Sequence, residues 1–266
     1  MKNIVLFFVL TSFFVLEGYA QDNKIKISCD YKLSYSKNKN DIPDKRHSKM
    51  TLDLGENCSR FCSVDAQKKD SLLYWDLKVL SPTEILGNKG KYRSKAPKYV
   101  ILKNYPEKNE ITYSSKIVDQ YYQYTEKPTF DWTLTNESDS LLGYYCLKAT
   151  CNYEGRDYIA WFTPEIPISD GPWKFFGTPG LILFIADTEG HYSFECVGIK
   201  KIQGSQEILL ADRDYIVCNK KEYLQAENRS KQDLLKYINN TTGITITRKS
   251  PVIKKSKFEY NPIELE

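Results

Sequence analysis

Histidine is scarce in this chain of 266 residues, which holds only His47 and His191. A nucleophilic hydrolase needs a base beside its nucleophile, and histidine is the usual choice. The sequence contains no Gly-x-Ser-x-Gly elbow, His-Glu-x-x-His helix or phosphate-binding glycine loop. It also lacks Cys-x-x-Cys spacing, so no zinc-binding set can be recognised. We therefore assign no catalytic residue and expect neither a metal nor another cofactor.

Long apolar runs are missing after the first twenty residues, so we expect no transmembrane segment in the mature chain. Residues 1–20 read as a signal peptide, with Lys2 near the start and an apolar run from Ile4 to Leu16. Small residues then precede a cleavage site after Ala20. The sequence therefore predicts an exported protein, periplasmic or secreted.

A strong excess of one charge is also lacking, because 38 lysines and arginines face 34 aspartates and glutamates. The net charge of +4 argues against nucleic acid as the main partner. The densest basic run extends from Lys89 to Lys98. We interpret this run as a solvated loop rather than a phosphate-binding patch.

Seven cysteines lie in the expected mature chain, where an oxidising compartment would permit disulfides. Cys58 and Cys62 would be about 13 Å apart if residues 52–64 formed one extended strand, too far for a disulfide. Cys146 and Cys151 would point to opposite faces of a strand. We therefore expect any disulfide to join different strands, with these candidates: Cys29, Cys58, Cys62, Cys146, Cys151, Cys196 and Cys218.

Short alternating runs rich in Tyr, Ile, Val and Thr recur along the chain and are joined by short turns. Short connections require antiparallel neighbours. The sequence therefore predicts a mainly β fold, an antiparallel meander forming a curved sheet, a half-barrel or a barrel. We expect strands at residues 24–36, 50–64, 98–105, 110–124, 129–135, 141–153, 157–163, 181–187 and 192–202.

One or two helices are expected to cover this sheet. Asp65 is a candidate cap for a helix running to Leu80, in which Leu72, Trp75 and Val79 share a face. A second helix, at about residues 219–239, begins with Asn219 and Glu222 in a capping arrangement. Its apolar stripe would hold Tyr223, Leu234, Leu235 and Ile238. A basic tail, residues 248–266, would complete a single β-rich domain at 21–266.

The run from Leu181 to Ile185 is apolar on both faces, so it needs cover on both sides. That cover is either ordinary packing or a cavity that holds an apolar ligand. Just before it, the Gly171–Phe176 segment places three aromatic residues in an irregular loop. These aromatics either form an exposed recognition patch or fold inward to plug the end of a barrel or sandwich.

The stretch from Thr129 to Asp187 resembles the GLPGLI family, exported proteins of Bacteroidetes-type bacteria. The naming motif appears here as Gly177-Thr178-Pro179-Gly180-Leu181-Ile182, with threonine at the second position in place of leucine. The best-matching core is 129–202, and further matches include Trp132, Cys146, Arg156, Ala160-Trp161-Phe162, Gly171-Pro172 and Asn261-Pro262-Ile263-Glu264-Leu265. The resemblance implies export, and it brings no established activity. Members of the family also look like neighbours of outer-membrane receptors in their genomes.

Our leading hypothesis is a non-enzymatic β-protein that binds an apolar or amphipathic ligand, or a peptide. The candidate binding residues are Trp161, Trp173, Phe175, Phe176, Pro179 and Leu181. One alternative is a partner protein of an outer-membrane receptor. Another is a hydrolase or thiol enzyme that uses His191 with Asp187, or Cys146 with Lys148 on the same strand face to favour the thiolate.

Overall fold

The computed structural model describes residues 23–40, 44–232 and 259–265, and these ranges form one sheet of twelve strands. The expected signal peptide lies outside the described residues. The strands are β1 (Ile27–Ser36), β2 (Lys45–Leu54), β3 (Ser59–Cys62), β4 (Val100–Lys103), β5 (Ile111–Ile117), β6 (Gln120–Glu126), β7 (Thr133–Leu141), β8 (Tyr144–Tyr153), β9 (Arg156–Thr163), β10 (Leu181–Asp187), β11 (Tyr192–Lys201) and β12 (Tyr215–Val217).

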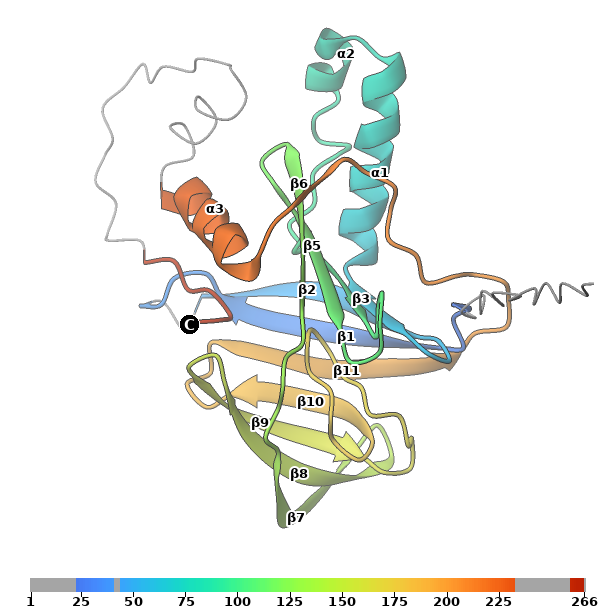
Figure 1. Ribbon diagram of the computed structural model, residues 1–266, viewed down its shortest axis with the longest axis vertical. Coiled ribbons are helices and arrows are strands. Elements are labelled where there is room, and N and C mark those ends of the chain that lie inside the picture. The colour runs from blue at the N-terminus through green and yellow to red at the C-terminus, as the bar shows by residue number, and fades with distance from the viewer. Residues whose placement is uncertain (1–22, 41–43, 233–258, 266) are drawn as a thin grey trace, which may run out of the picture.

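Two meanders make up the sheet. One runs from β1 to β6 and the other from β7 to β11, and the two join where β1 pairs with β11 (Figure 1). All neighbouring strands are antiparallel except β12, which adds to the edge at β6 in parallel. The predicted antiparallel β architecture is therefore confirmed. The barrel option is wrong, because β12 and β7 end the strand order as two separate edges.

Two expected strands are hairpins instead. The run 50–64 turns after Leu54, where the N–H of Gly55 donates to the carbonyl of Cys58 at 2.9 Å. The run 110–124 turns at Val118, whose φ of 59° lies in the left-handed region that tight turns use. Both turns are short, Gly55-Glu56-Asn57 and Val118-Asp119, and each lies between two runs of strand-like composition. The strand expected at 129–135 begins only at Thr133.

Within the described ranges, three short helices accompany the sheet: α1 (Val64–Val79), α2 (Pro82–Gly87) and α3 (Lys220–Gln232). The Ser63 hydroxyl caps α1 by accepting from the N–H of Ala66, so the predicted cap at Asp65 is wrong. The predicted capping box of α3 is confirmed, because Asn219 and Glu222 exchange backbone-to-side-chain hydrogen bonds of 2.9 Å. The expected apolar positions Leu234, Leu235 and Ile238 lie outside the described residues.

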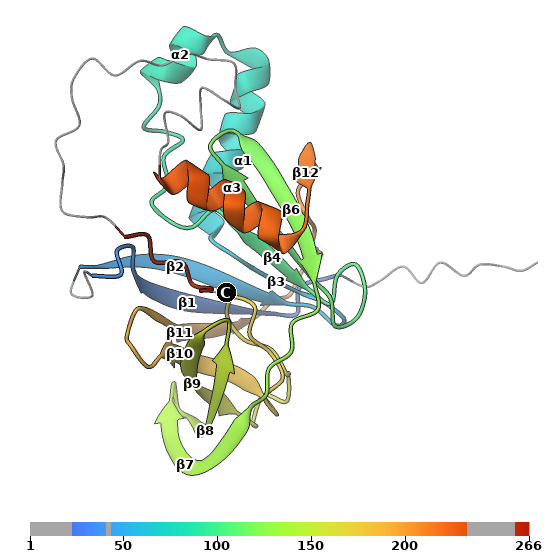
Figure 2. The same cartoon turned by 60° about the vertical axis from the view of Figure 1, so that its left-hand side comes forward.

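The helices cover the sheet unequally. In α3, Tyr223 is buried against Tyr113 and Tyr124, so this helix packs on β5 and β6 (Figure 2). By contrast, α1 contacts the sheet through its first half, where Asp70 pairs with Lys116 of β5, and its far end and α2 extend away from the sheet (Figure 1). None of the helices in the described ranges has the length and apolar character needed to cross a lipid bilayer.

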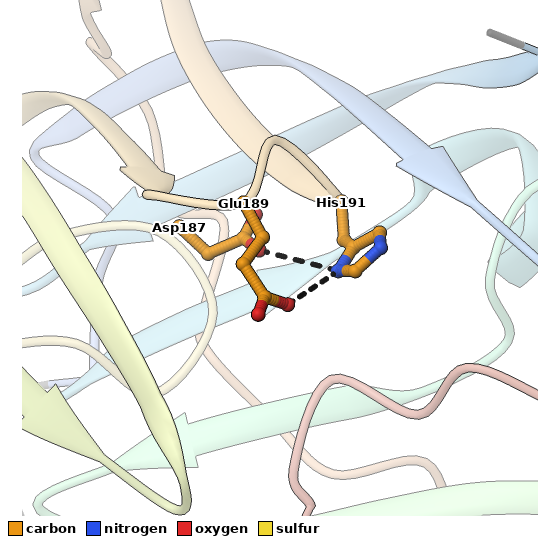
Figure 3. Close-up of side chains that lie close together, drawn as sticks. All are labelled: Asp187, Glu189 and His191. Carbon is orange, nitrogen blue, oxygen red and sulfur yellow. Dashed lines mark ion pairs between the residues drawn. The ribbon is translucent and has the colours of Figure 1, made fainter. Parts of the chain in front are cut away.

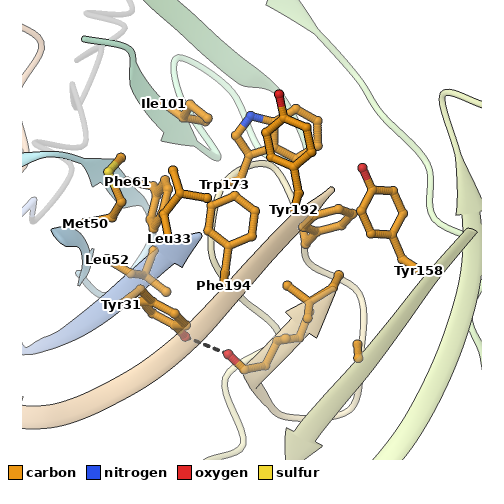
Figure 4. Close-up of a cluster of buried hydrophobic side chains, with 14 of the residues drawn as sticks. Tyr31, Leu33, Met50, Leu52, Phe61, Ile101, Tyr158, Trp173, Tyr192 and Phe194 are labelled. Atoms are coloured by element: carbon orange, nitrogen blue, oxygen red, sulfur yellow. Dashed lines mark hydrogen bonds between the residues drawn. The ribbon is translucent and has the colours of Figure 1, made fainter. Parts of the chain in front are cut away.

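The core lies where β1, β2, β3 and β11 meet the loop that joins β9 to β10 (Figure 4). Inward-facing residues alternate along these strands, as Tyr31 and Leu33 do on β1. The hydroxyl of Tyr31 donates to the carbonyl of Ile182 at 2.6 Å, which ties β1 to β10 across the core. A buried phenol paired in this way avoids the cost of an unsatisfied polar group.

Candidate functional site

The aromatic loop between β9 and β10 is folded inward. Trp173 is 1% exposed and Phe175 is 0% exposed. The Phe175 ring lies 4.8 Å from the ring of Tyr158 and 5.2 Å from that of Trp173. Of the two arrangements that the sequence left open, the structure has the inward one. These rings contact other core side chains, as Figure 4 shows for Trp173.

The other candidate binding residues are spread over different environments. Leu181 is fully buried, Trp161 and Phe176 are half-buried, and Pro179 is exposed. On β10, Ile182 packs so tightly against the β9–β10 loop that a Cβ placed on Gly171 would lie 2.9 Å from its side chain. The chain itself therefore supplies cover for the doubly apolar strand there.

In the Gly177–Ile182 motif, the backbone of the β9–β10 loop lies very close to the backbone of β9. Thr178 is buried, and its hydroxyl donates to the carbonyl of Gly180 at 2.7 Å. Gly180 has a φ of 151°, and a Cβ placed there would lie 2.1 Å from the carbonyl oxygen of Thr163. Only glycine fits this position without displacing the backbone of β9.

We expect Gly180→Ala to destabilise the protein by about 2–4 kcal/mol, because the new methyl group overlaps the Thr163 carbonyl at an unfavourable φ. Urea unfolding followed by tyrosine and tryptophan fluorescence measures the change. Gly204→Ala is the control, because a Cβ there meets nothing within 4 Å. Equal stabilities of the two variants would contradict the interpretation that the backbone at Gly180 leaves no room for a side chain.

Two buried lysines anchor the loop from inside. The Lys103 ammonium pairs with Asp170 and donates to the carbonyls of Gly171 at 2.5 Å and Phe175 at 3.2 Å. Lys174, fully buried, pairs with Glu126 and Glu264 and donates to the hydroxyl of Tyr124 at 2.9 Å. Buried charges are tolerated only when paired in this way, so the loop's place depends on these partners.

Arg156 holds the C-terminal clasp, which we define as residues 259–265. Its guanidinium donates to the side-chain oxygen of Asn261 at 2.6 Å, to the carbonyl of Pro262 at 2.8 Å and to that of Ile263 at 3.1 Å. The Asn261 side chain in turn donates to the carbonyl of Ser36 at 3.0 Å. Three consecutive residues of the clasp, Asn261, Pro262 and Ile263, are therefore each held by a specific hydrogen bond. These contacts give a structural reason for the Asn261-Pro262-Ile263 sequence near the end of the chain.

His191 and Asp187, the proposed catalytic pair, do lie together, but inside the same network (Figure 3). The Nδ1 atom of His191 is 3.6 Å from Asp187, 3.1 Å from Glu189 and 3.0 Å from the Arg156 guanidinium. The side chains of His191 and Asp187 are 4% and 1% exposed. Such a pair is shielded from any substrate in this structure, so the geometry favours a structural role.

The donor atoms of Asp187, Glu189 and His191 lie within 4.8 Å of one another, which resembles a cation-binding set. The cation among them is the Arg156 guanidinium, whose Nη1 is 3.2 Å from Asp187 and 3.9 Å from Glu189. A divalent ion bound at about 2 Å by the same atoms would repel that guanidinium at short range. The cluster is therefore suited to the arginine.

The seven candidate disulfide cysteines are all unpaired thiols, and six of them are buried, Cys218 being half-buried. Burial raises the pKa of Cys62 and Cys196 to about 11 and that of Cys151 to about 12. Burial also raises the pKa of Cys146, while Lys148 pairs with Glu137 at 2.7 Å. The proposed reactive thiol is therefore held protonated, which does not favour a nucleophilic role.

A groove of about 520 Å³ opens between α1 and the outer face of β3 to β6. Its floor contains Cys62, Val100 and Ser114, which are direct neighbours across β3, β4 and β5. The first turns of α1 form one wall, and the segment 209–215 forms the other. We call this cavity the α1 groove.

Positive side chains outnumber negative ones in the α1 groove. Five basic residues line it against two aspartates: Arg60, Lys68, Lys98, Lys116 and Arg213 against Asp70 and Asp212. Asp70 is already engaged, because it accepts from Tyr121 at 2.8 Å and from Lys116 at 3.2 Å. Arg60 pairs with Asp53 at 2.7 Å. The groove keeps a surplus of positive charge after these pairs are formed.

Lys98 and Arg213 are incompletely compensated cations of the groove: Lys98 has no ion pair within the described residues, and Arg213 reaches only Asp70, at 3.9 Å, which it shares with Lys116. The pKa of Lys98 lies below its ordinary value, because the surroundings desolvate the partly exposed ammonium and Lys116 adds like charge. Arg213 stacks on Tyr74, 3.7 Å from the ring centre, and its buried Nε has no hydrogen-bond partner among the described residues. An anion placed here would relieve both defects.

The sequence interpretation did not find the α1 groove. It treated Lys98 as part of a solvated loop, and it left Arg60, Lys116 and Arg213 unremarked. The signal available was weak: Arg60 and Cys62, or Ser114 and Lys116, are two apart and therefore share a strand face. Arg213 joins these residues in the groove because β12 pairs with β6, and no local sequence pattern predicts that pairing.

Comparison with known proteins supports the β fold and assigns no activity. The sequence model of a family described as "Protein of unknown function (Porph_ging)" matches residues 153–184, from the end of β8 into β10. No curated protein matches the chain.

Two solved structures share the fold. They are "Structure of PNGF-II in P21 space group", with a TM-score of 0.54 at 14% identity, and "Structure of PNGF-II in C2 space group", with 0.51 at 15%. The similarity covers 77% and 76% of this chain but only 34% and 32% of the PNGF-II chains, so this chain spans about a third of their length. This chain is therefore similar in fold to part of PNGF-II, and its β9–β10 region is similar to a family of unknown function.

Proposed function

We propose that this chain is an exported, non-enzymatic binding protein that holds an anionic, amphipathic ligand in the α1 groove. The observation that carries the proposal is the surplus of positive charge around a cavity of about 520 Å³. That volume is within the range of small-molecule sites, which is about 300–1,000 Å³. The signal-peptide pattern and the GLPGLI resemblance support export.

The lining of the groove suggests the ligand's two parts. Apolar contacts are available from Val64, Val100, Leu209 and Leu210, while Lys98 and Arg213 offer cations. A ligand with a carboxylate, sulfate or phosphate group beside an apolar body would satisfy both. The candidate residues Trp173, Phe175 and Leu181 would then support the fold rather than contact the ligand.

An anionic fluorescent probe, 1-anilinonaphthalene-8-sulfonate, tests the proposal. We expect the Lys98→Glu variant to bind it at least about tenfold more weakly, since a charge-assisted contact contributes about 1.5–3 kcal/mol. Wild-type affinity should also fall as salt is raised. The matched control is Lys89→Glu, which makes the same charge change at an exposed position outside the groove.

A neutral analogue, N-phenyl-1-naphthylamine, separates charge from apolar binding. We expect it to bind Lys98→Glu and the wild type alike. Equal loss of the anionic probe in Lys98→Glu and Lys89→Glu would contradict the groove as the binding site. The protein for these assays is purified from the periplasm of a diderm host. An intact mass equal to that of a chain starting at Gln21 would support the proposed export and cleavage.

A further inference from the structure

The projecting pair α1–α2 leaves large apolar side chains in water. Trp75, Leu77, Val79 and Leu86 are 60%, 59%, 77% and 68% exposed. Ala66 is the only buried residue of α1, and α2 has none. Both views show these helices extending away from the sheet (Figures 1 and 2). We call the four exposed apolar residues the helical tip.

The helical tip is apolar on more than one side. Trp75 and Val79 are one turn apart on α1, whereas Leu77 lies two residues from each and points to the opposite side. The predicted stripe of Leu72, Trp75 and Val79 therefore does not cover the sheet. A flat partner could bury one side only, whereas a lipid surface can surround the end of the helices.

The surroundings of the tip are basic. Residues 64–98 contain eight lysines and arginines but only four acidic residues. Those acids are engaged locally: Asp65 pairs with Lys69, Asp70 with Lys116, Asp76 with Lys91, and Glu84 caps α2. Six cations of this segment have no carboxylate partner within the described ranges. Lys68 and Lys98 line the α1 groove, and the other four are Lys78, Lys89, Arg93 and Lys95.

Lys78 has the arrangement expected of a side chain beside a lipid surface. Its ammonium lies 4.3 Å from the ring centre of Tyr74 and 4.5 Å from that of Trp75. Aromatic rings with apolar bodies and polar edges are suited to the boundary between hydrocarbon and headgroups. Lysines beside them can reach lipid phosphates while their carbon chains stay in apolar contact.

We propose that the helical tip inserts into the surface of an anionic membrane. Apolar side chains on opposite sides of α1 would enter the headgroup–acyl boundary, and the surrounding cations would contact lipid phosphates. A protein partner is less well matched, because the cores of protein interfaces are depleted in lysine. The inference does not depend on a ligand in the α1 groove.

Flotation with lipid vesicles tests the inference. We expect the full-length mature protein to float with vesicles of equal phosphatidylglycerol and phosphatidylcholine, and to stay in solution with phosphatidylcholine alone. Binding should weaken as salt is raised. Replacing Lys78 by glutamine should lower partition about fivefold, the effect typical of one cation near an anionic surface.

The decisive variant replaces the tip by Trp75→Ser, Leu77→Ser, Val79→Ser and Leu86→Ser together. Because these side chains are exposed, the fold should survive, which circular dichroism and thermal unfolding check, while flotation is lost. Leu134→Ser with Val197→Ser is the control, because both are exposed apolar residues on strands, at 55% and 49%. Trp75 gives a second readout, since its emission should shift to the blue on binding and Trp75→Phe should remove the shift.

Two outcomes would overturn the inference. One is flotation by the folded tip variant at the level of the wild type. The other is failure of the folded wild type to bind anionic vesicles at low salt, in which case crosslinking from position 77 would test a protein partner instead. The two proposals are tested separately. The tip variant should lose vesicle binding and keep the binding of the anionic probe, and failure of one proposal leaves the other standing.

Discussion

Replacing Arg156 by methionine is expected to release the C-terminal clasp and lower the free energy of unfolding by about 3–5 kcal/mol, the usual cost of removing one partner of a buried charge network. The guanidinium has a side-chain exposure of 2% and contacts Asp187, which is 1% exposed. Without Arg156, the buried carboxylate of Asp187 would lose its ion-pair partner, which destabilises the folded state. The clasp would lose the donor to Asn261 and to two carbonyls.

Urea unfolding measures the loss of stability, and limited proteolysis with mass spectrometry measures release of the clasp. Arg93→Met is the control, because Arg93 is exposed and has no carboxylate partner in the described part of the chain; we expect a change within about 0.5 kcal/mol. If Arg156→Met does not fold, Asn261→Ala removes one clasp contact at a cost of about 1–3 kcal/mol. A clasp equally protected in both Arg variants would contradict its dependence on Arg156.

Replacing Lys174 by methionine should also cost about 3–5 kcal/mol at pH 8, and the penalty should shrink as the pH falls. Lys174 stands between Glu126 and Glu264, and Lys220 is 3.5 Å from Glu264. Burial raises the pKa of Glu264, and the two lysines oppose that rise. Without Lys174 the pKa of Glu264 would rise further, so the folded variant would bind the proton more tightly.

The sign of the pH effect follows from linkage. An acid whose pKa rises on folding contributes fully to stability below its unfolded pKa, about 4.3 for glutamate. The contribution is lost as the pH rises through the folded value. We therefore expect the destabilisation by Lys174→Met to be clearly smaller at pH 4.5 than at pH 8.

Urea unfolding at pH 4.5, 6 and 8 checks this profile. The control is Lys148→Met, which removes a pair with the exposed Glu137 and should cost at most about 1 kcal/mol. A penalty for Lys174→Met that is independent of pH would show that Glu264 does not respond to Lys174. The prediction for Arg156 would be unaffected.

Local features were predictable where the residues that determine them lie within one short segment. The box at Asn219 and Glu222 involves a single turn of chain, and the structure has it as expected. Alternation placed most strands, because a half-buried sheet imposes a period of two. Two short turns were missed, Gly55-Glu56-Asn57 and Val118-Asp119, because each lies between two runs of strand-like composition.

The sequence by itself determined the antiparallel β architecture, because alternating residues and short connections leave adjacent strands few other ways to pair. Only the tertiary structure decided which distant residues meet. Arg156 contacts Asn261, about a hundred residues away in the sequence, and Lys98 and Arg213 line the same groove. Periodicity assigns a residue to a face, whereas its partner depends on strand order, here the pairing of β1 with β11 and of β12 with β6. Helical periodicity likewise aligned Trp75 with Val79, but the packing of the whole chain left them in water.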